Sequence, residues 1–338
     1  MRSGRTAVTT ISGRGSLSAF AVGRRAEWAG ITEQCGALLF RGFDLSDAED
    51  FRDCATALTG EILTFPEESS PRSRMADAVF TATDYSQEVP IQFHSEHSYA
   101  YEWPLKIVFG CLQPSRSGGR TLLADNRKVL HEIPRDLVAT FIRRGILYVR
   151  HYSEHRGVRW QDAFGVTDLA DLTAMCAQRG ITIETAAGGA IQTRQSGPAV
   201  RRHPRTGEQV WFNHASVFNV ASIEPGWLRD LMKAQPAEAL VTQTYFGDGA
   251  EISDEIIGQI KGGYHRATLE PFDWVPGDVL LVDNMLLAHA REPYSGDRQV
   301  LVAMAGATRG TESDSGTAAA GRGYDAGTQL DNVKGEPG

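Results

Sequence analysis

Residues 278–289 read DVLLVDNMLLAH, and this stretch carries the clearest signal of the fold. The apolar run from Val279 to Val282 stands between two aspartates, a pattern typical of a short buried strand rather than a helix. Similar short apolar runs occur at 37–40 (ALLF), 107–112 (IVFGCL) and 300–304 (VLVAM). We therefore expect a chain dominated by short buried strands.

Helical patterns are fewer. Apolar residues recur at helical spacing over 126–143, and 168–179 predicts a second helix. Residues 44–58, with Ser46 as a cap, predict another. The turn RTG at 205–207 separates two further β segments. Because strands and helices do not alternate regularly, the sequence favours a mainly β architecture with helical decoration. The most specific expectation from this pattern is a jelly roll.

The sequence predicts one large domain over 1–306 and a tail over 307–338. The tail is rich in Gly, Ala, Ser, Thr and Asp, and its only sizeable apolar residues are Tyr324, Leu330 and Val333. So few apolar side chains cannot repay the entropy lost on folding. We therefore expect the tail to be disordered.

Charge and composition exclude several classes of protein. The formal charge is 34 − 42 = −8 and no basic stripe is visible, which argues against nucleic acid as a partner. No apolar run approaches the ~18 residues of a membrane span, and residues 1–14 lack the apolar core of a secretory signal. We therefore expect a cytoplasmic protein. The four cysteines are isolated and predict neither disulfides nor zinc: Cys35, Cys54, Cys111 and Cys176.

A candidate metal site begins in residues 91–97, which read IQFHSEH. On a strand, alternation places His94 and Glu96 on the same face. His289, just beyond the apolar strand 279–282, is the candidate third ligand. Two histidines and one carboxylate form the facial triad of non-haem iron(II) oxygenases, which leaves three positions open for substrate and oxygen. Gln92 shares the face of His94 by the same alternation and is a candidate cosubstrate contact or support for the metal ligands.

Candidate anion-binding residues accompany the triad. Arg298 follows His289 by nine residues and can grip a carboxylate with two hydrogen bonds. Thr121, after Gly118-Gly119-Arg120, offers a hydroxyl to the same carboxylate. A cosubstrate with two carboxylates, bound to the metal by its keto-acid end, would suit both residues. The alternative for Arg298 is a surface ion pair with Asp297 or Asp283.

Several motifs in this order resemble the taurine dioxygenase-like, clavaminate synthase-like group of iron(II) and 2-oxoglutarate oxygenases. They are ALLFRGF (37–43), FHSEHSY (93–99), GGRT (118–121), HPRTG (203–207) and DNMLLAHAREP (283–293), followed by Arg298. The resemblance implies a double-stranded β-helix that uses Fe(II), 2-oxoglutarate and O2. It places the iron on His94, Glu96 and His289, and 2-oxoglutarate on Thr121 and Arg298.

Within this group, four stretches look most like the hydroxylase of syringomycin biosynthesis: SPR (70–72), TDY (83–85), WPLK (103–106) and WFN (211–213). That branch acts on amino acids, often tethered to a peptidyl carrier protein. Many members of the wider superfamily carry Asp where this chain has Glu96, and Ala290 replaces a Gly often found after the last histidine. The candidate substrate contacts are Arg72, Tyr99, Arg194 and Asn213.

The resemblance implies hydroxylation of an unactivated carbon, with release of succinate and CO2. Glu96 fills the position that halogenases of this kind leave to chloride. Desaturation, epoxidation and cyclisation begin with the same hydrogen abstraction and are alternatives. Two further alternatives use the same residues differently: a non-catalytic β-barrel that senses a keto acid or metal, and a zinc hydrolase.

Overall fold

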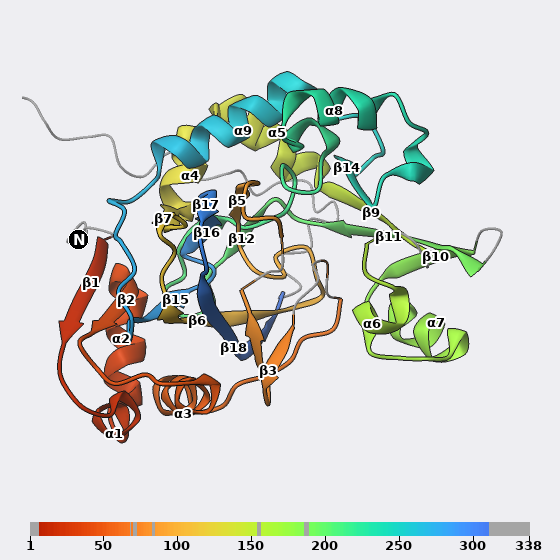
Figure 1. Cartoon of the computed structure of the whole chain (residues 1–338). Helices are drawn as coiled ribbons and strands as arrows, with labels where there is room; N and C mark the ends of the chain where they lie inside the picture. Colours follow the sequence, from red (N-terminus) through yellow and green to blue (C-terminus); the bar gives the residue numbers. More distant parts are fainter. Residues whose placement is uncertain are drawn as a thin grey trace, which may run out of the picture.

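The computed structural model describes residues 7–67, 69, 73–82, 85–153, 157–185 and 189–310. Two β-sheets form its centre (Figure 1). The larger sheet has seven strands, in the order β1 (Ala7–Ser12), β2 (Gly36–Arg41), β15 (Val279–Asp283), β6 (Glu102–Gln113), β18 (Gln299–Arg309), β4 (Val79–Thr81) and β3 (Arg74–Ala76). The smaller sheet has three, in the order β5 (Ile91–His94), β16 (Leu287–Arg291) and β8 (Thr121–Asp125).

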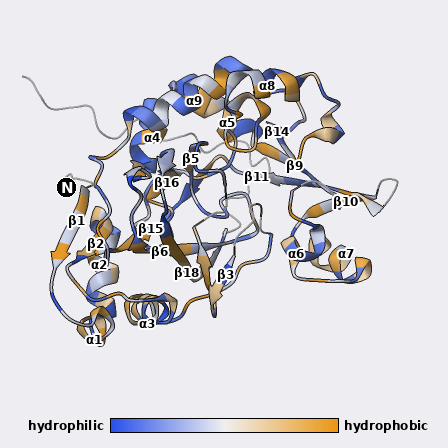
Figure 2. Cartoon of the chain, viewed as in Figure 1, coloured by the Kyte–Doolittle hydropathy of each residue, from blue (hydrophilic) through white to orange (hydrophobic). Residues whose placement is uncertain are grey.

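Both faces of the larger sheet are buried, which explains its continuous apolar runs. Leu38 and Phe40 of β2 pack on helices α1 (Leu17–Ala21), α2 (Arg25–Cys35) and α3 (Ala48–Thr59). Leu39 points the other way and joins a core with Leu123 and Leu287 of the smaller sheet. In Figure 2 strand β6 is coloured largely as apolar, while the helices around the sheets carry both polar and apolar residues. The two sheets therefore share one core, as in a double-stranded β-helix.

Helices α4 (Asn126–Glu132), α5 (Arg135–Arg144) and α9 (Asp254–Arg266) cover the smaller sheet (Figure 1). In α9 the missing side chain of Gly263 allows a close approach, since a Cβ there would meet Ile133 at 3.0 Å. The predicted helix over 126–143 is two helices in the structure. Pro134 lies between them, and proline disfavours helical backbone in the residue before it.

A second group of elements forms an arm to one side of the two sheets (Figure 1). Its sheet has the order β10 (Ile181–Thr185), β11 (Ile191–Gly197), β9 (Ile146–Tyr152) and β14 (Thr242–Phe246). Helices α6 (Trp160–Phe164) and α7 (Leu169–Gln178) pack there against β9 and β11. The remaining short elements are β7 (Ser117–Gly118), β12 (Val200–Arg202), β13 (Gln209–Trp211), β17 (Tyr294–Ser295), α8 (Gly226–Lys233), η2 (Val220–Ser222) and η3 (Ala237–Ala239).

The expected mainly β class with helical decoration is confirmed. The predicted helix over 168–179 is α7, capped by Asp168, and the turn 205–207 joins β12 to β13. The predicted helix over 44–58 is α3, capped by Asp47 rather than Ser46. Helices α1, α2, α6, α8 and α9 were not predicted. Strand β18 continues to Arg309, three residues past the expected domain boundary, and the rest of the proposed tail, 311–338, lies outside the described residues.

The structure also describes the cysteines and the length of the helices. Each of the four cysteines is buried and free. Within the described residues, no helix combines the length and the apolar character needed to cross a membrane.

Candidate active site

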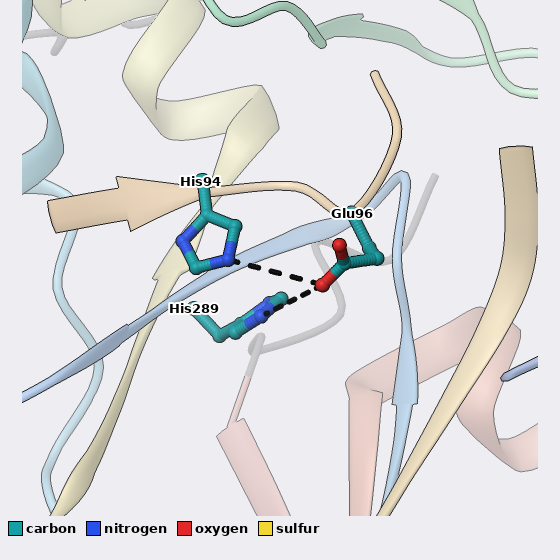
Figure 3. Close-up of side chains that lie close together, drawn as sticks. All are labelled: His94, Glu96 and His289. Carbon is teal, nitrogen blue, oxygen red and sulfur yellow. Dashed lines mark ion pairs between the residues drawn. The ribbon is translucent and has the colours of Figure 1, made fainter. Parts of the chain in front are cut away.

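His94, Glu96 and His289 come together between β5 and β16 (Figure 3). His94 ends β5 and pairs in register with His289 of β16, while Glu96 lies in the turn that follows β5. The Nε2 atoms of His94 and His289 are 3.9 and 3.8 Å from Glu96 Oε2. One ligand atom from each residue lies within 4.8 Å of the others.

These three side chains fit a divalent metal. The carbonyl of Gln92 can only accept, so the 2.9 Å contact with His94 Nδ1 makes that nitrogen the donor and leaves the Nε2 lone pair available. Two imidazoles and one carboxylate on one side of a metal are the donor set of non-haem iron(II) oxygenases. The set matches the three predicted ligands.

Asn284 holds the main chain of Glu96. Its Oδ1 accepts a 2.7 Å hydrogen bond from the Glu96 amide, and its Nδ2 donates to the carbonyls of Glu96 and Pro104, both at 2.8 Å. The side chain is fully buried, so these bonds form away from water. Partners outside the ligand set commonly determine how well the ligands are oriented.

Asp283 anchors the turn that carries Asn284. Its Oδ1 accepts the amide hydrogens of Met285 and Leu286, and its Oδ2 lies 2.7 Å from Lys106 Nζ. His203 Nε2 donates to the same carboxylate at 3.2 Å. Burial alone would raise the pKa of Asp283, but Lys106 and His203 outweigh it and hold the pKa at about 2.

His203 joins the HPRTG motif to this network. Its Nδ1 accepts from the amides of Arg205 and Thr206 at 3.2 and 3.0 Å, so Nε2 carries the proton that it donates to Asp283. Asn284 and Asp283, together with Lys106 and His203, therefore form one network that supports the backbone of Glu96.

A cavity opens beside the triad, with about 440 Å³ of empty space. That space includes the open solvent at the mouth of the cavity. The triad and Arg298 line it together with Ala82, Ile91, Phe109, Thr121, Ala290, Arg291 and Val302. A small ligand in this cavity would contact both the metal position and the predicted anion-binding residues.

Arg298 and Thr121 form the anion-binding side of the cavity. Arg298 Nε donates to the carbonyl of Gly119 at 3.1 Å, and burial lowers the pKa of this guanidinium to about 10. Thr121 Oγ1 accepts a 3.1 Å hydrogen bond from Trp274 Nε1, so its own proton is free to be donated to a ligand. Among the described residues, Arg298 makes no ion pair with a carboxylate: Asp283 pairs instead with Lys106 and His203.

Arg291 is a second guanidinium in the same cavity, and it was not predicted. Arg291 follows His289 by two residues on β16, and residues two apart on a strand share a face. The same alternation that was used for His94 would therefore have predicted Arg291. Its charge acts on Arg298 and lowers the pKa of Arg298 further. The cavity thus contains two guanidinium groups, Arg291 buried and Arg298 partly buried.

Gln92 does not line this cavity and lies instead at a smaller one. His289 pairs with His94, and Arg291 pairs with Ile91. The two strands thus differ by one residue over this stretch, and the extra residue is on β5. This β-bulge breaks the alternation on which the prediction depended. The cavity is therefore lined by Ile91 and His94.

Two of the candidate substrate residues, Tyr99 and Asn213, do not line this cavity. Tyr99 is buried and donates its hydroxyl to the carbonyl of Glu67 at 2.5 Å. Both polar groups of the Asn213 side chain are bonded to backbone, at Ala199 and Ala215.

Of the two remaining candidates, Arg194 does not line the cavity. Arg194 is on β11 in the arm, and Arg72 lies outside the described residues. Tyr99 and Asn213, which lie in the family motifs, thus make hydrogen bonds to the backbone within the protein.

His214 is a further histidine beside the triad. Its ring centroid is 6.0 Å from that of His94, and its Nδ1 is 2.6 Å from Ser98 Oγ. Burial holds its pKa well below the ordinary value. His214 is therefore neutral near pH 7 and adds no positive charge to the metal position.

Two known proteins are similar to this chain over most of its length. The chain is 34% identical over 274 residues to the dapdiamide synthesis protein DdaC of Enterobacter agglomerans, covering 81% of this chain and 83% of that protein. It is 28% identical over 285 residues to a clavaminate synthase-like protein of Arabidopsis thaliana, covering 81% and 82%. These relatives confirm the predicted resemblance to the clavaminate synthase-like group.

The fold recurs in a crystal structure from Burkholderia xenovorans assigned to the alpha-ketoglutarate-dependent taurine dioxygenases. That structure has a TM-score of 0.51 and 16% identity, and the match covers 90% of this chain and 92% of the other. The sequence profile of one family matches residues 11–305, which include all three candidate metal ligands. This chain belongs to the taurine catabolism dioxygenase TauD, TfdA family.

Proposed function

We propose that this protein is an Fe(II)/2-oxoglutarate-dependent oxygenase that hydroxylates an unactivated carbon of an amino acid. One observation carries the proposal: the His94, Glu96 and His289 triad opens into the same cavity as Arg298 and Thr121. A metal-binding end and an anion-binding end in one cavity suit a keto acid with a distal carboxylate.

In this proposal each side chain has a defined task. His94, Glu96 and His289 hold the iron, while Arg298 and Thr121 bind and orient the distal carboxylate. Phe109 and Val302 add apolar side chains to the lining of the same cavity. Iron with 2-oxoglutarate and O2 supplies the oxidising power, yielding succinate and CO2 and one oxygen atom for the substrate.

The proposed substrate class is an amino acid, free or tethered to a peptidyl carrier protein. DdaC, at 34% identity, is named for the synthesis of dapdiamide, and four stretches of this chain resemble amino acid hydroxylases of syringomycin biosynthesis. Both comparisons favour a role in natural-product biosynthesis. Desaturation, epoxidation and cyclisation are the alternative outcomes of the same hydrogen abstraction.

A zinc hydrolase and a keto-acid sensor use the same residues differently. A hydrolase has no need of two guanidinium groups lining the cavity beside its metal, which favours the oxygenase. A sensor would bind metal and keto acid without turnover.

Succinate production distinguishes these functions. Protein loaded with Fe(II) and ascorbate is incubated with 2-oxoglutarate, O2 and a panel of amino acids and aminoacyl carrier proteins. We expect one substrate to raise succinate release in a 1:1 ratio with product. Binding of 2-oxoglutarate without succinate from any of them would support the sensor, and activity with Zn(II) in the absence of O2 would support the hydrolase.

A further inference from the structure

Arg291 is a buried cation whose hydrogen bonds do not go to a carboxylate. Only 6% of its surface is exposed, and burial lowers its pKa. Within the parts of the chain that the structure describes, it makes no ion pair. A buried charge without a counter-ion is costly, so a residue of this kind needs a reason to be there.

The hydrogen bonds of Arg291 all go to one segment of backbone. Its Nη1 donates to the carbonyl of Tyr85 at 3.3 Å, and its Nη2 donates to the carbonyls of Ser86 and Val89 at 2.7 and 2.6 Å. We call residues 85–90 the clamped segment. The amide of Tyr294 adds a fourth bond, to the carbonyl of Gln87 at 2.9 Å.

The clamped segment adjoins the cosubstrate cavity. It leads directly into Ile91, which lines the cavity, and three residues later into the candidate ligand His94. Residues 85–89 are exposed, whereas Arg291 beneath them is buried. The bonds from Arg291 and Tyr294 hold this exposed segment against the buried end of β16, and exposed segments open more easily than buried ones.

We propose that Arg291 is a positioning residue that couples binding of 2-oxoglutarate to the order of the clamped segment. The inference rests on the proposed function and adds to it a connection between two parts of the site. An anion in the cavity compensates the neighbouring charges of Arg298 and Arg291. It thereby stabilises the buried position of Arg291, from which the three hydrogen bonds to the segment are made.

Coupling of this kind works in both directions. If the cosubstrate favours the ordered segment, the ordered segment must favour the cosubstrate by the same factor. The segment leads into β5, so its order also bears on the position of His94. Arg291 would therefore prepare the metal side of the cavity once the cosubstrate is present.

Limited proteolysis can measure the order of the segment. A glutamate-specific protease cleaves after Glu88, inside the segment, and after the exposed Glu61, which serves as an internal reference. The protein is loaded with Zn(II), so that no turnover occurs, and its Kd for 2-oxoglutarate is measured first by calorimetry. We expect saturating 2-oxoglutarate to slow cleavage after Glu88 by at least about fivefold, the lower end of typical coupling, and to leave cleavage after Glu61 unchanged.

Two variants test the role of Arg291. Arg291→Lys keeps the charge but loses the planar fork, and Arg291→Met loses both. In each, cleavage after Glu88 should be faster than in wild type, and saturating 2-oxoglutarate should no longer slow it. Arg120→Met is the matched control, because Arg120 lies nearby but is already paired with Glu292. It should behave as wild type.

The outcomes separate this inference from the proposed function. Absence of 2-oxoglutarate binding to wild type would overturn both. Normal binding without protection of Glu88, or equal protection in Arg291→Lys and wild type, would overturn the coupling alone. Loss of all binding in both variants would make Arg291 a direct ligand of the anion and contradict its positioning role.

Discussion

The carboxamide of Asn284 bonds both the amide and the carbonyl of Glu96, at 2.7 and 2.8 Å. The two residues are 188 positions apart in sequence. Glu96 lies outside β5, in a turn, where the regular hydrogen bonds of a sheet do not hold it. The Asn284 side chain supplies that restraint, so the position of the candidate metal carboxylate depends on a residue that never touches the metal.

Asn284→Ala should weaken metal binding by roughly 10- to 100-fold, the usual effect of removing a residue that orients a metal ligand. The measurement is the Kd for Co(II) or Fe(II) under anaerobic conditions. Asn219→Ala is the control, because Asn219 is also buried and bonded, but to Thr244 and the backbone of Ala221. It should lower stability while the Kd for the metal stays the same, and equal losses of affinity in both variants would refute the specific role of Asn284.

Arg298→Ala should raise the KM for 2-oxoglutarate by roughly ten- to a hundred-fold. A hydrogen bond to a charged group contributes about 1.5–3 kcal/mol, and ~1.4 kcal/mol corresponds to tenfold. Arg298→Lys should recover only part of the loss, since an ammonium cannot make the planar two-point contact. The Kd for the metal should barely change. An unchanged KM combined with lower stability would make Arg298 a structural residue.

The stability conferred by Asp283 should depend on pH. Its folded pKa of about 2 lies below the unfolded value of about 3.9, so its carboxylate stabilises the fold above about pH 4 by on the order of 2 kcal/mol. This contribution is lost as the pH falls from about 4 through 2. Urea unfolding should show Asp283→Asn less stable than wild type at pH 7, with the difference shrinking toward pH 2.

The exposed Asp248, which pairs with Arg144, provides the control for that experiment. Asp248→Asn should change stability far less at pH 7. A difference between wild type and Asp283→Asn that stays constant from pH 7 to pH 2 would show that the ion pairs with Lys106 and His203 do not stabilise the fold.

Truncation after Gly310 should leave the melting temperature and the turnover rate unchanged, because the composition of 311–338 provides too few apolar residues for a core. Truncation after Gly306 should lower the melting temperature. It removes the end of β18, where Ala307, Thr308 and Arg309 pair with Pro104, Trp103 and Glu102. A large loss of activity after the shorter deletion would show that the tail contributes to the site.

Much of this site follows from local patterns in the sequence. The HSE triplet after an apolar strand predicted His94 and Glu96, and the apolar strand 279–282 pointed to His289. The structure brings all three together. Short apolar runs likewise predicted β2, β6, β15 and β18, because both faces of these strands are buried and the runs need not alternate.

Each prediction from the sequence that was wrong or missing has a specific physical cause. Gln92 lies on a β-bulge, and an inserted residue cannot be seen without knowing the partner strand. Pro134 divides a segment whose apolar spacing reads as one helix. Asn284 acts on a residue distant in sequence, so its role depends on contacts that only the folded chain creates. The motifs that supply the metal ligands could be recognised in the sequence. The partners that these residues contact over long distances in sequence could not.

The central claim is that His94, Glu96 and His289 hold an iron(II) that oxidises 2-oxoglutarate in this cavity. The most direct test is CO2 release from 2-oxoglutarate labelled at C1, with Fe(II) and O2, compared between wild type and His289→Ala. We predict release by wild type that requires both Fe(II) and O2 and falls to background in the variant, together with weaker iron binding. Equal release from wild type and His289→Ala, or no release with any substrate tried, would contradict the account.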